Sequence, residues 1–133
     1  MNATPPFFPL LGQILLAVLF LLSGVAKIAG PAATLAYIGS AHLPLPTAAY
    51  AIAVIVEVGG GLLLVAGYQV RAVALVLAIY SVATAIAFHH DFADQSQMIN
   101  FLKNIAITGG LLQVVAFGAG PFSVDAARTS HRP

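Results

Sequence analysis

Charge is scarce in this sequence, and cysteine and tryptophan are absent. Only 7% of the 133 residues are charged, five basic and four acidic, whereas about 25% is typical of soluble domains. This composition excludes an ordinary soluble enzyme, a disordered chain and a polycationic nucleic-acid-binding protein, so we predict no nucleic-acid partner. Without cysteine the chain forms no disulfide, no thiolate metal site and no cysteine-bound iron–sulfur cluster.

Long apolar runs make up most of the chain. Hydrophobic residues account for 60% of the sequence, and its mean hydropathy is +0.99. A helix that spans a membrane needs about 20 mostly apolar residues, and four stretches of this length leave little polar material to cover a soluble core. We therefore predict an all-α integral membrane four-helix bundle, forming a single domain over residues 1–133. Its spans lie at about residues 8–28, 46–67, 70–89 and 98–117.

The connections predict how these spans are arranged. Residues 67–69 form a very short turn, which makes the second and third spans antiparallel neighbours. Residues 31–45 are apolar but long for a turn, and we interpret them as a short interfacial segment, helical or re-entrant, with Tyr37 at headgroup level. The lipid bilayer is therefore the first expected partner.

Basic residues predict the orientation of the bundle. Four spans place both termini on one side, together with Arg71, Arg128 and Arg132, whereas the other side has Lys27 and Lys103 at helix ends. Because positive charge in short loops favours the cytoplasm, we predict that both termini and a tail formed by residues 118–133 are cytoplasmic. Arg71 would then anchor its helix at the membrane interface.

A few polar residues fall inside the spans, where charge is costly and normally faces the bundle interior. Glu57 lies about 11 residues into its span, near the midplane. Lys27, His89, Lys103 and Asn104 lie in the outer half. A lysine stem bridges about 6 Å, so either lysine is a candidate partner for Glu57. We predict one polar cluster open toward the outer face, with Glu57 as proton carrier and the other four as ligand-binding residues.

Helical spacing supports this cluster without deciding its role. Lys103 and Asn104 fall on one predicted face of the fourth span, and Gly60 and Gly61 on one face of the second. Small residues allow helices to approach closely, or they leave room for a flat ligand. Glu57 with a lysine is equally interpretable as a structural ion pair. Adjacent histidines at 89 and 90 point about 100° apart, and we predict no metal site.

At these residues the sequence resembles the DoxX family of small four-span bacterial membrane proteins. The similar segments, in order, are Phe20–Gly24 with Lys27, Leu43–Pro46, Glu57 with Gly59–Gly61, Phe88–His89, Phe101–Asn104 and Gly118–Ser123. The resemblance implies a four-helix bundle of the bacterial inner membrane. It also implies an association with redox systems, because a subunit similar to this fold occurs in a thiosulfate:quinone oxidoreductase.

Three functions are consistent with these features. The first is a quinone-associated accessory subunit of a membrane redox system, in which electrons come from a redox partner protein because the chain has no cysteine. The second is a non-catalytic anchor or assembly module for a partner protein. The third is a small-solute or proton conduit, which in a bundle this narrow would need a homo-oligomer. Quinone is the cofactor that the first function requires.

Overall fold

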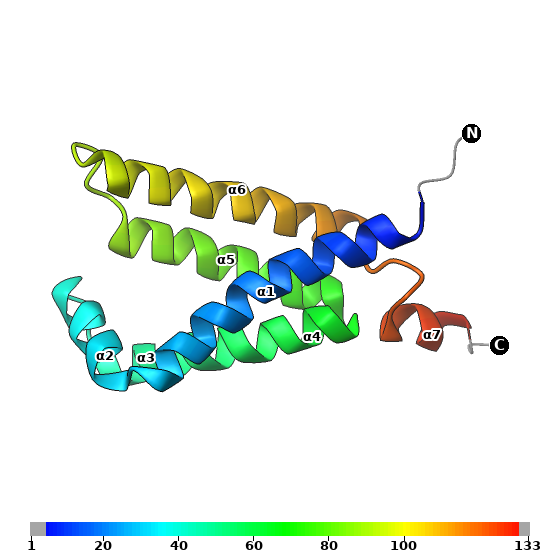
Figure 1. Cartoon of the computed structure of the whole chain (residues 1–133), viewed down its shortest axis with the longest axis horizontal. Coiled ribbons are helices and arrows are strands. Elements are labelled where there is room, and N and C mark those ends of the chain that lie inside the picture. Colours follow the sequence, from blue (N-terminus) through cyan, green and yellow to red (C-terminus); the bar gives the residue numbers. More distant parts are fainter. Residues whose placement is uncertain (1–4, 131–133) are drawn as a thin grey trace.

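The computed structural model describes residues 5–130, and its long helices form a bundle (Figure 1). Three of them are continuous: α1 (Phe7–Ala29), α5 (Val70–Phe88) and α6 (Gln95–Phe117). The fourth consists of α3 (Pro46–Val54), a π-helical turn η1 (Ile55–Gly59) and α4 (Gly60–Ala66). All four are long and apolar enough to cross a membrane, and no strand occurs among the described residues. The predicted all-α membrane bundle is confirmed.

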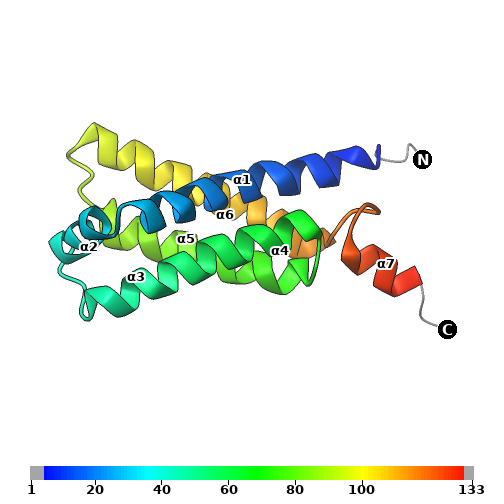
Figure 2. The same cartoon turned by 60° about the horizontal axis from the view of Figure 1, so that its bottom comes forward.

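Two short helices mark the two ends of the bundle (Figure 2). Helix α2 (Pro31–Ser40) lies at one end, with the last turn of α5 and the first turn of α6; we name this the α2 end. Helix α7 (Val124–Ser130) lies at the opposite end, with the start of α1 and the turn between α4 and α5; we name this the termini end. The tail after residue 118, for which the sequence predicted no structure, thus contains a helix.

Local chemistry sets where the helices begin and end. Proline occupies the first position of α2 and of α3, where its missing N–H costs nothing. Gly67 ends α4 with a φ of +71°, a conformation that suits glycine. The Asp94 side chain caps α6 by accepting hydrogen bonds from the backbone N–H groups of Ser96 (2.9 Å) and Gln97 (3.4 Å). This cap explains why α6 begins three residues before the predicted span.

Glycines let α1 pack closely against the π-turn and α4. A Cβ atom on Gly24 would lie 2.6 Å from Val58 Cγ2 and 3.3 Å from the Val58 backbone nitrogen. A Cβ atom on Gly61 would lie 2.7 Å from Leu21 Cγ. These contacts leave no room for larger residues, so the glycines fix how near the two helices come.

An apolar core fills the middle of the bundle toward the termini end. It draws on α1, α4, α5 and α6, which contribute Ala17, Phe20, Leu64, Val70, Ala74, Leu77, Ala78 and Leu111. The polar residues Ser23, Lys27 and Glu57 lie on the α2 side of this core. The core therefore separates them from the termini end.

Candidate functional site

A cavity of about 490 Å³ opens inside the bundle on the α2 side of the core. Its walls come from α1, α2, α3, η1, α5 and α6, so residues far apart in the sequence line it together. Most of the lining is apolar, with Leu19, Phe20, Ile52, Ala53 and Ile107 among its residues. The volume falls in the range of small-molecule sites, about 300–1,000 Å³, and such sites typically combine apolar walls with a few placed polar groups.

The polar part of this cavity is a cluster formed by Lys27, Glu57 and Ser23. Lys27 Nζ lies 3.1 Å from Glu57 Oε1 and 3.0 Å from Oε2. Ser23 Oγ donates to Oε1 at 3.0 Å and accepts from Lys27 Nζ at 2.8 Å. The Glu57 side chain is only 6% exposed and that of Lys27 25%. A carboxylate at this burial needs a counter-charge, and Lys27 supplies it.

One oxygen of Glu57 is less satisfied than the other. Oε2 is buried and has the ionic contact with Lys27 but no hydrogen bond of good geometry. A carboxylate accepts several hydrogen bonds, so Oε2 has capacity for one more donor, which the neighbouring Tyr80 hydroxyl or a bound molecule can supply.

The π-turn brings Glu57 to the bundle interior. Ala53, Glu57 and Gly61 are all buried although they are spaced four residues apart. In a regular α-helix residues at this spacing drift around the axis, and the wider π-turn offsets that drift. A hydrogen bond from α3 fixes the backbone at Lys27, since Tyr50 Oη donates to the Lys27 carbonyl oxygen at 2.9 Å. Both members of the ion pair are thus positioned by the helices that carry them.

Further polar groups line the cavity from α5 and α6. Tyr80 lies beside the Glu57 carboxylate. Asn104 donates a 3.3 Å hydrogen bond to Thr84 Oγ1 and a longer one, at 3.5 Å, to the Ser81 carbonyl oxygen. His89, at the end of α5, also contributes to the wall. The cavity therefore has polar groups, bonded within the protein, on α5 and α6 as well.

An aromatic pair lies where the cavity reaches the α2 end. The rings of Tyr37 (α2) and Phe88 (α5) stack with centroids 4.9 Å apart and an interplanar angle of 14°. Both residues line the cavity. At the opposite side the cavity meets Phe20, which belongs to the apolar core. The cavity therefore lies between the aromatic pair at the α2 end and the apolar core.

The structure brings together four of the six residues singled out in the sequence. Lys27, Glu57, His89 and Asn104 line the one cavity. Lys103 does not, because it is exposed on the outer side of α6. Neighbouring residues of a helix point about 100° apart, so Lys103 cannot share the inward face that Asn104 occupies. The expected single face containing both was wrong, and the partner of Glu57 is Lys27.

Arg71 lies away from this cavity. It is the second residue of α5, at the termini end, where it lines a separate cavity described below. Its exposed position is consistent with an interface anchor. The orientation of the bundle relative to the cytoplasm stays a prediction.

Sequence reasoning missed Tyr80 and Ser23 as members of the site. Ser23 precedes Lys27 by one helical turn, and this spacing is a usable signal because residues four apart in a helix face the same side. Tyr80 carries no comparable signal. Its neighbour Ser81 is buried and lies on the face that the sequence predicted to be polar. Tyr80 adjoins Glu57 because of how α5 is rotated about its own axis, and the sequence does not report that rotation.

The comparisons with known proteins agree with this architecture. Residues 8–90 match the DoxX family, which is more than half of the chain. The chain belongs to the DoxX family. The matched region contains Ser23, Lys27, Glu57, Tyr80 and His89, and it ends before α6. Most of the cavity is therefore built from the part that defines the family.

Two bacterial relatives match this DoxX-family chain over most of their length. Inner membrane protein YqjF of Escherichia coli K12 is 35% identical over 119 residues, covering 87% of this chain and 88% of the relative. Inner membrane protein YphA of the same organism is 34% identical over 129 residues, covering 93% and 92%. No solved structure shows a significant match.

Proposed function

We propose that this DoxX-family protein binds a quinone in the cavity beside Lys27 and Glu57, as an accessory subunit of a redox system in the bacterial inner membrane. The location rests on the four membrane-length helices and on the two relatives named as inner membrane proteins. The ligand class rests on the cavity. Its walls suit a flat apolar ring, and its polar groups are grouped where carbonyl oxygens can be bound.

The observation that carries the proposal is the buried polar cluster around the Glu57 carboxylate. Lys27 Nζ lies on one side of the cavity and the Asn104 amide on the other, each bonded to protein acceptors that a ligand carbonyl would replace. Tyr80 adds a hydroxyl next to Glu57. Donors on two sides of an apolar slot fit a ring with two carbonyl groups. The residues present therefore fit a quinone.

A bound quinone supplies two-electron chemistry that is coupled to protons at its carbonyl oxygens. Lys27 would bind one carbonyl oxygen in exchange for a protein acceptor, Ser23 would keep the Glu57 carboxylate in place, and Asn104 would orient the ring from the far wall. Glu57 is the group able to hold or release a proton inside the bundle. The apolar core excludes water from the termini side. Electrons come from a partner protein, since no residue type in this chain stores them.

The test begins with gentle purification of the full chain, followed by organic extraction and mass spectrometry for quinones. We expect quinone at near one molecule per chain, well above its share of the extracted lipid. Replacing Ala53, a buried wall residue, by leucine narrows the cavity next to Glu57 and removes no polar group. Ala53→Leu should lose the quinone and keep the fold. Ala106→Leu, on the exposed side of α6, is the matched control and should retain it.

Quinone present only at its share of bulk lipid would overturn the proposal, as would equal retention by Ala53→Leu. The alternative is the assembly module, which one observation favours: the Lys27–Glu57 pair ties α1 to the π-turn and would serve a purely structural purpose. That function predicts a stable partner protein in pull-downs and no enriched ligand. The apolar core that adjoins the cavity at Phe20 argues against a conduit through the single bundle.

A further inference from the structure

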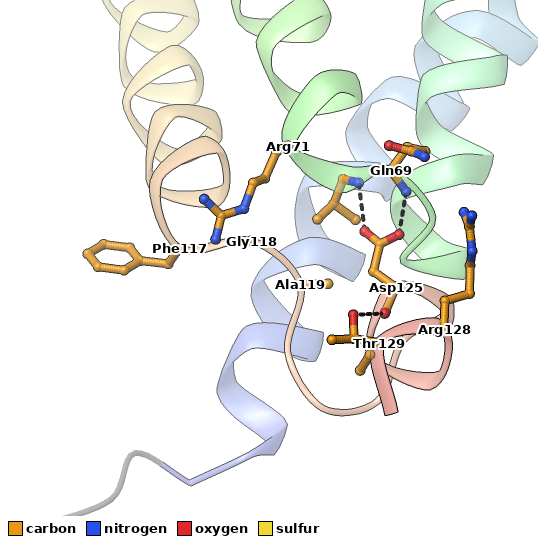
Figure 3. Close-up of a pocket in the computed structure, with 10 residues that line it drawn as sticks. Gln69, Arg71, Phe117, Gly118, Ala119, Asp125, Arg128 and Thr129 are labelled. Carbon is orange, nitrogen blue, oxygen red and sulfur yellow. Dashed lines mark hydrogen bonds between the residues drawn. The ribbon is translucent and has the colours of Figure 1, made fainter. Parts of the chain in front are cut away.

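A second cavity, of about 360 Å³, lies at the termini end (Figure 3). It is formed by the start of α5, the end of α6 and helix α7. Two arginines, Arg71 and Arg128, line it together with Asp125, Phe117 and Gly118. The family match covers only one of these five residues, because it ends at residue 90.

Asp125, the single acidic residue of this lining, already accepts hydrogen bonds from backbone N–H groups. Asp125 Oδ1 accepts from the Gln69 backbone N–H at 2.7 Å, and Oδ2 accepts from the Val70 N–H at 3.0 Å. These are among the free N–H groups at the start of α5, so the carboxylate acts as a helix cap. Within residues 5–130 neither Arg71 nor Arg128 has a carboxylate within 4.0 Å. With two guanidinium groups and one carboxylate, the lining carries net positive charge.

Both guanidinium groups are held in place by contacts that leave their N–H donors free. A Cβ atom on Gly118 would lie 2.9 Å from Arg71 Nε and 3.1 Å from Nη2, so the guanidinium lies directly against the glycine. Gly118 has a φ of +72°, which also favours glycine at this position. Arg128 lies on the other side of Asp125 (Figure 3). Its guanidinium lies 5.3 Å from the centroid of the Tyr68 ring.

The end of the membrane-length helix α6 suits this cavity to a membrane surface. Phe117, the last residue of α6, is 76% exposed and lies beside Arg71 (Figure 3). In a bilayer this position would set its ring against acyl chains and the guanidinium against the headgroup layer. Aromatic and basic side chains together are typical of this interface. A ligand here has an anionic head and an apolar body.

We propose that this cavity binds the phosphate of an anionic phospholipid headgroup. Guanidinium recognises phosphate oxygens through two parallel N–H donors, and Arg71 presents its group at the mouth beside Phe117. Arg128 adds charge from the opposite rim. Asp125 does not repel the phosphate strongly, since its charge is directed at the α5 N–H groups. The lipid would join α5, α6 and α7 at one point.

Native mass spectrometry of the full chain tests this proposal directly. The protein, delipidated in a non-ionic detergent, is titrated with phosphatidylglycerol and with phosphatidylcholine of the same acyl chains. We expect bound phosphatidylglycerol at severalfold lower concentration than phosphatidylcholine. Arg71→Gln should weaken phosphatidylglycerol binding about tenfold, in line with the loss of a charge-assisted pair. Arg128→Gln should weaken it less. Neither side chain makes a hydrogen bond within the described chain, so both variants should fold.

Lys103→Gln is the matched control, because Lys103 is also an exposed cation but lies in the first half of α6 and does not line this cavity. It should leave phosphatidylglycerol binding unchanged. A loss as large as that of Arg71→Gln would show general attraction to charge and would overturn the site. Equal binding of phosphatidylglycerol and phosphatidylcholine would overturn the assignment of the cavity to an anionic headgroup. Displacement of the lipid by millimolar inorganic phosphate would assign the cavity to a free anion.

Discussion

The bundle treats charge differently in its interior and at its termini end. On the α2 side of the core Lys27 and Glu57 are drawn into the interior, where they contact each other at 3.0 Å, whereas Asp91 and Asp94 stay exposed in the loop before α6. At the termini end Arg71 and Arg128 stay exposed and have no acidic partner within the described chain. A cation inside the bundle requires a counter-charge, because lipid and core cannot solvate it. A cation at the surface is solvated by water and headgroups, so its donors remain available.

This contrast assigns different consequences to charge removal at the two ends. In the interior, removing one partner leaves the other uncompensated, and the main effect is on folding. At the surface, the main effect is on what the protein binds.

Glu57→Gln should produce the largest loss of stability. It leaves Lys27 beside a neutral amide within the bundle, and breaking a buried ion pair in this way costs about 3 kcal/mol. The free energy of unfolding is measured by denaturant titration in a mild detergent. The double variant Lys27→Met/Glu57→Gln removes both charges and should recover most of the loss. A double variant no more stable than Glu57→Gln would show that the pair is not the cause.

The sequence predicted the fold more completely than the site. Long apolar runs and the short turn at residues 67–69 predict four spans, because the bilayer imposes length and composition on every spanning helix. The depth of Glu57 was also predictable from the rise per residue. The choice between Lys27 and Lys103 was not, since depth does not report how a helix is rotated. The face of α6 is weakly marked, and most of its residues are exposed.

The π-turn was beyond prediction for a related reason. It preserves the inward direction of Ala53, Glu57 and Gly61, and this depends on packing against Gly24 of α1. The tail after Gly118 was equally hidden. Its helix docks through Asp125 onto backbone N–H groups at residues 69 and 70, a contact to which the span pattern gives no clue. Tertiary contacts, and not local preference, decide both features.

Gly24→Ala should rank second in its effect on stability, at about 2 kcal/mol. The added methyl group would meet Val58 Cγ2 at 2.6 Å and the Glu57 Cβ atom at 3.2 Å, forcing α1 away from the π-turn that carries the ion pair. Gly109→Ala is the control, because nothing lies within 4 Å of a Cβ atom there. The two are compared by denaturant titration. Equal stability of both variants would mean that the close contact adapts at little cost.

Asp125→Ala should destabilise the termini end by about 1 kcal/mol, the usual cost of losing a helix cap. The two N–H groups at the start of α5 would lose their acceptor, and α7 would keep only the backbone hydrogen bond from the Asp125 N–H to the Gly67 carbonyl oxygen at that turn. Hydrogen exchange should speed up in α7 and the first turn of α5. The same measurement at Lys27 and Glu57 should show no change. Faster exchange at both ends would contradict the separation of the ends by the apolar core.

Lys103→Gln should have the smallest effect, within about 0.5 kcal/mol of the wild-type stability. Lys103 is a lysine in a membrane-length helix, as Lys27 is, but it is exposed and has no acidic partner among residues 5–130. Its stem can extend along the lipid surface toward the α2 end, so no buried carboxylate depends on it. Lys27→Gln, measured in parallel, should cost several times more. A comparable loss from Lys103→Gln would mean that this lysine is buried in the membrane, against another copy of the chain or a partner. The division between paired interior charge and solvated surface charge would then have to include α6.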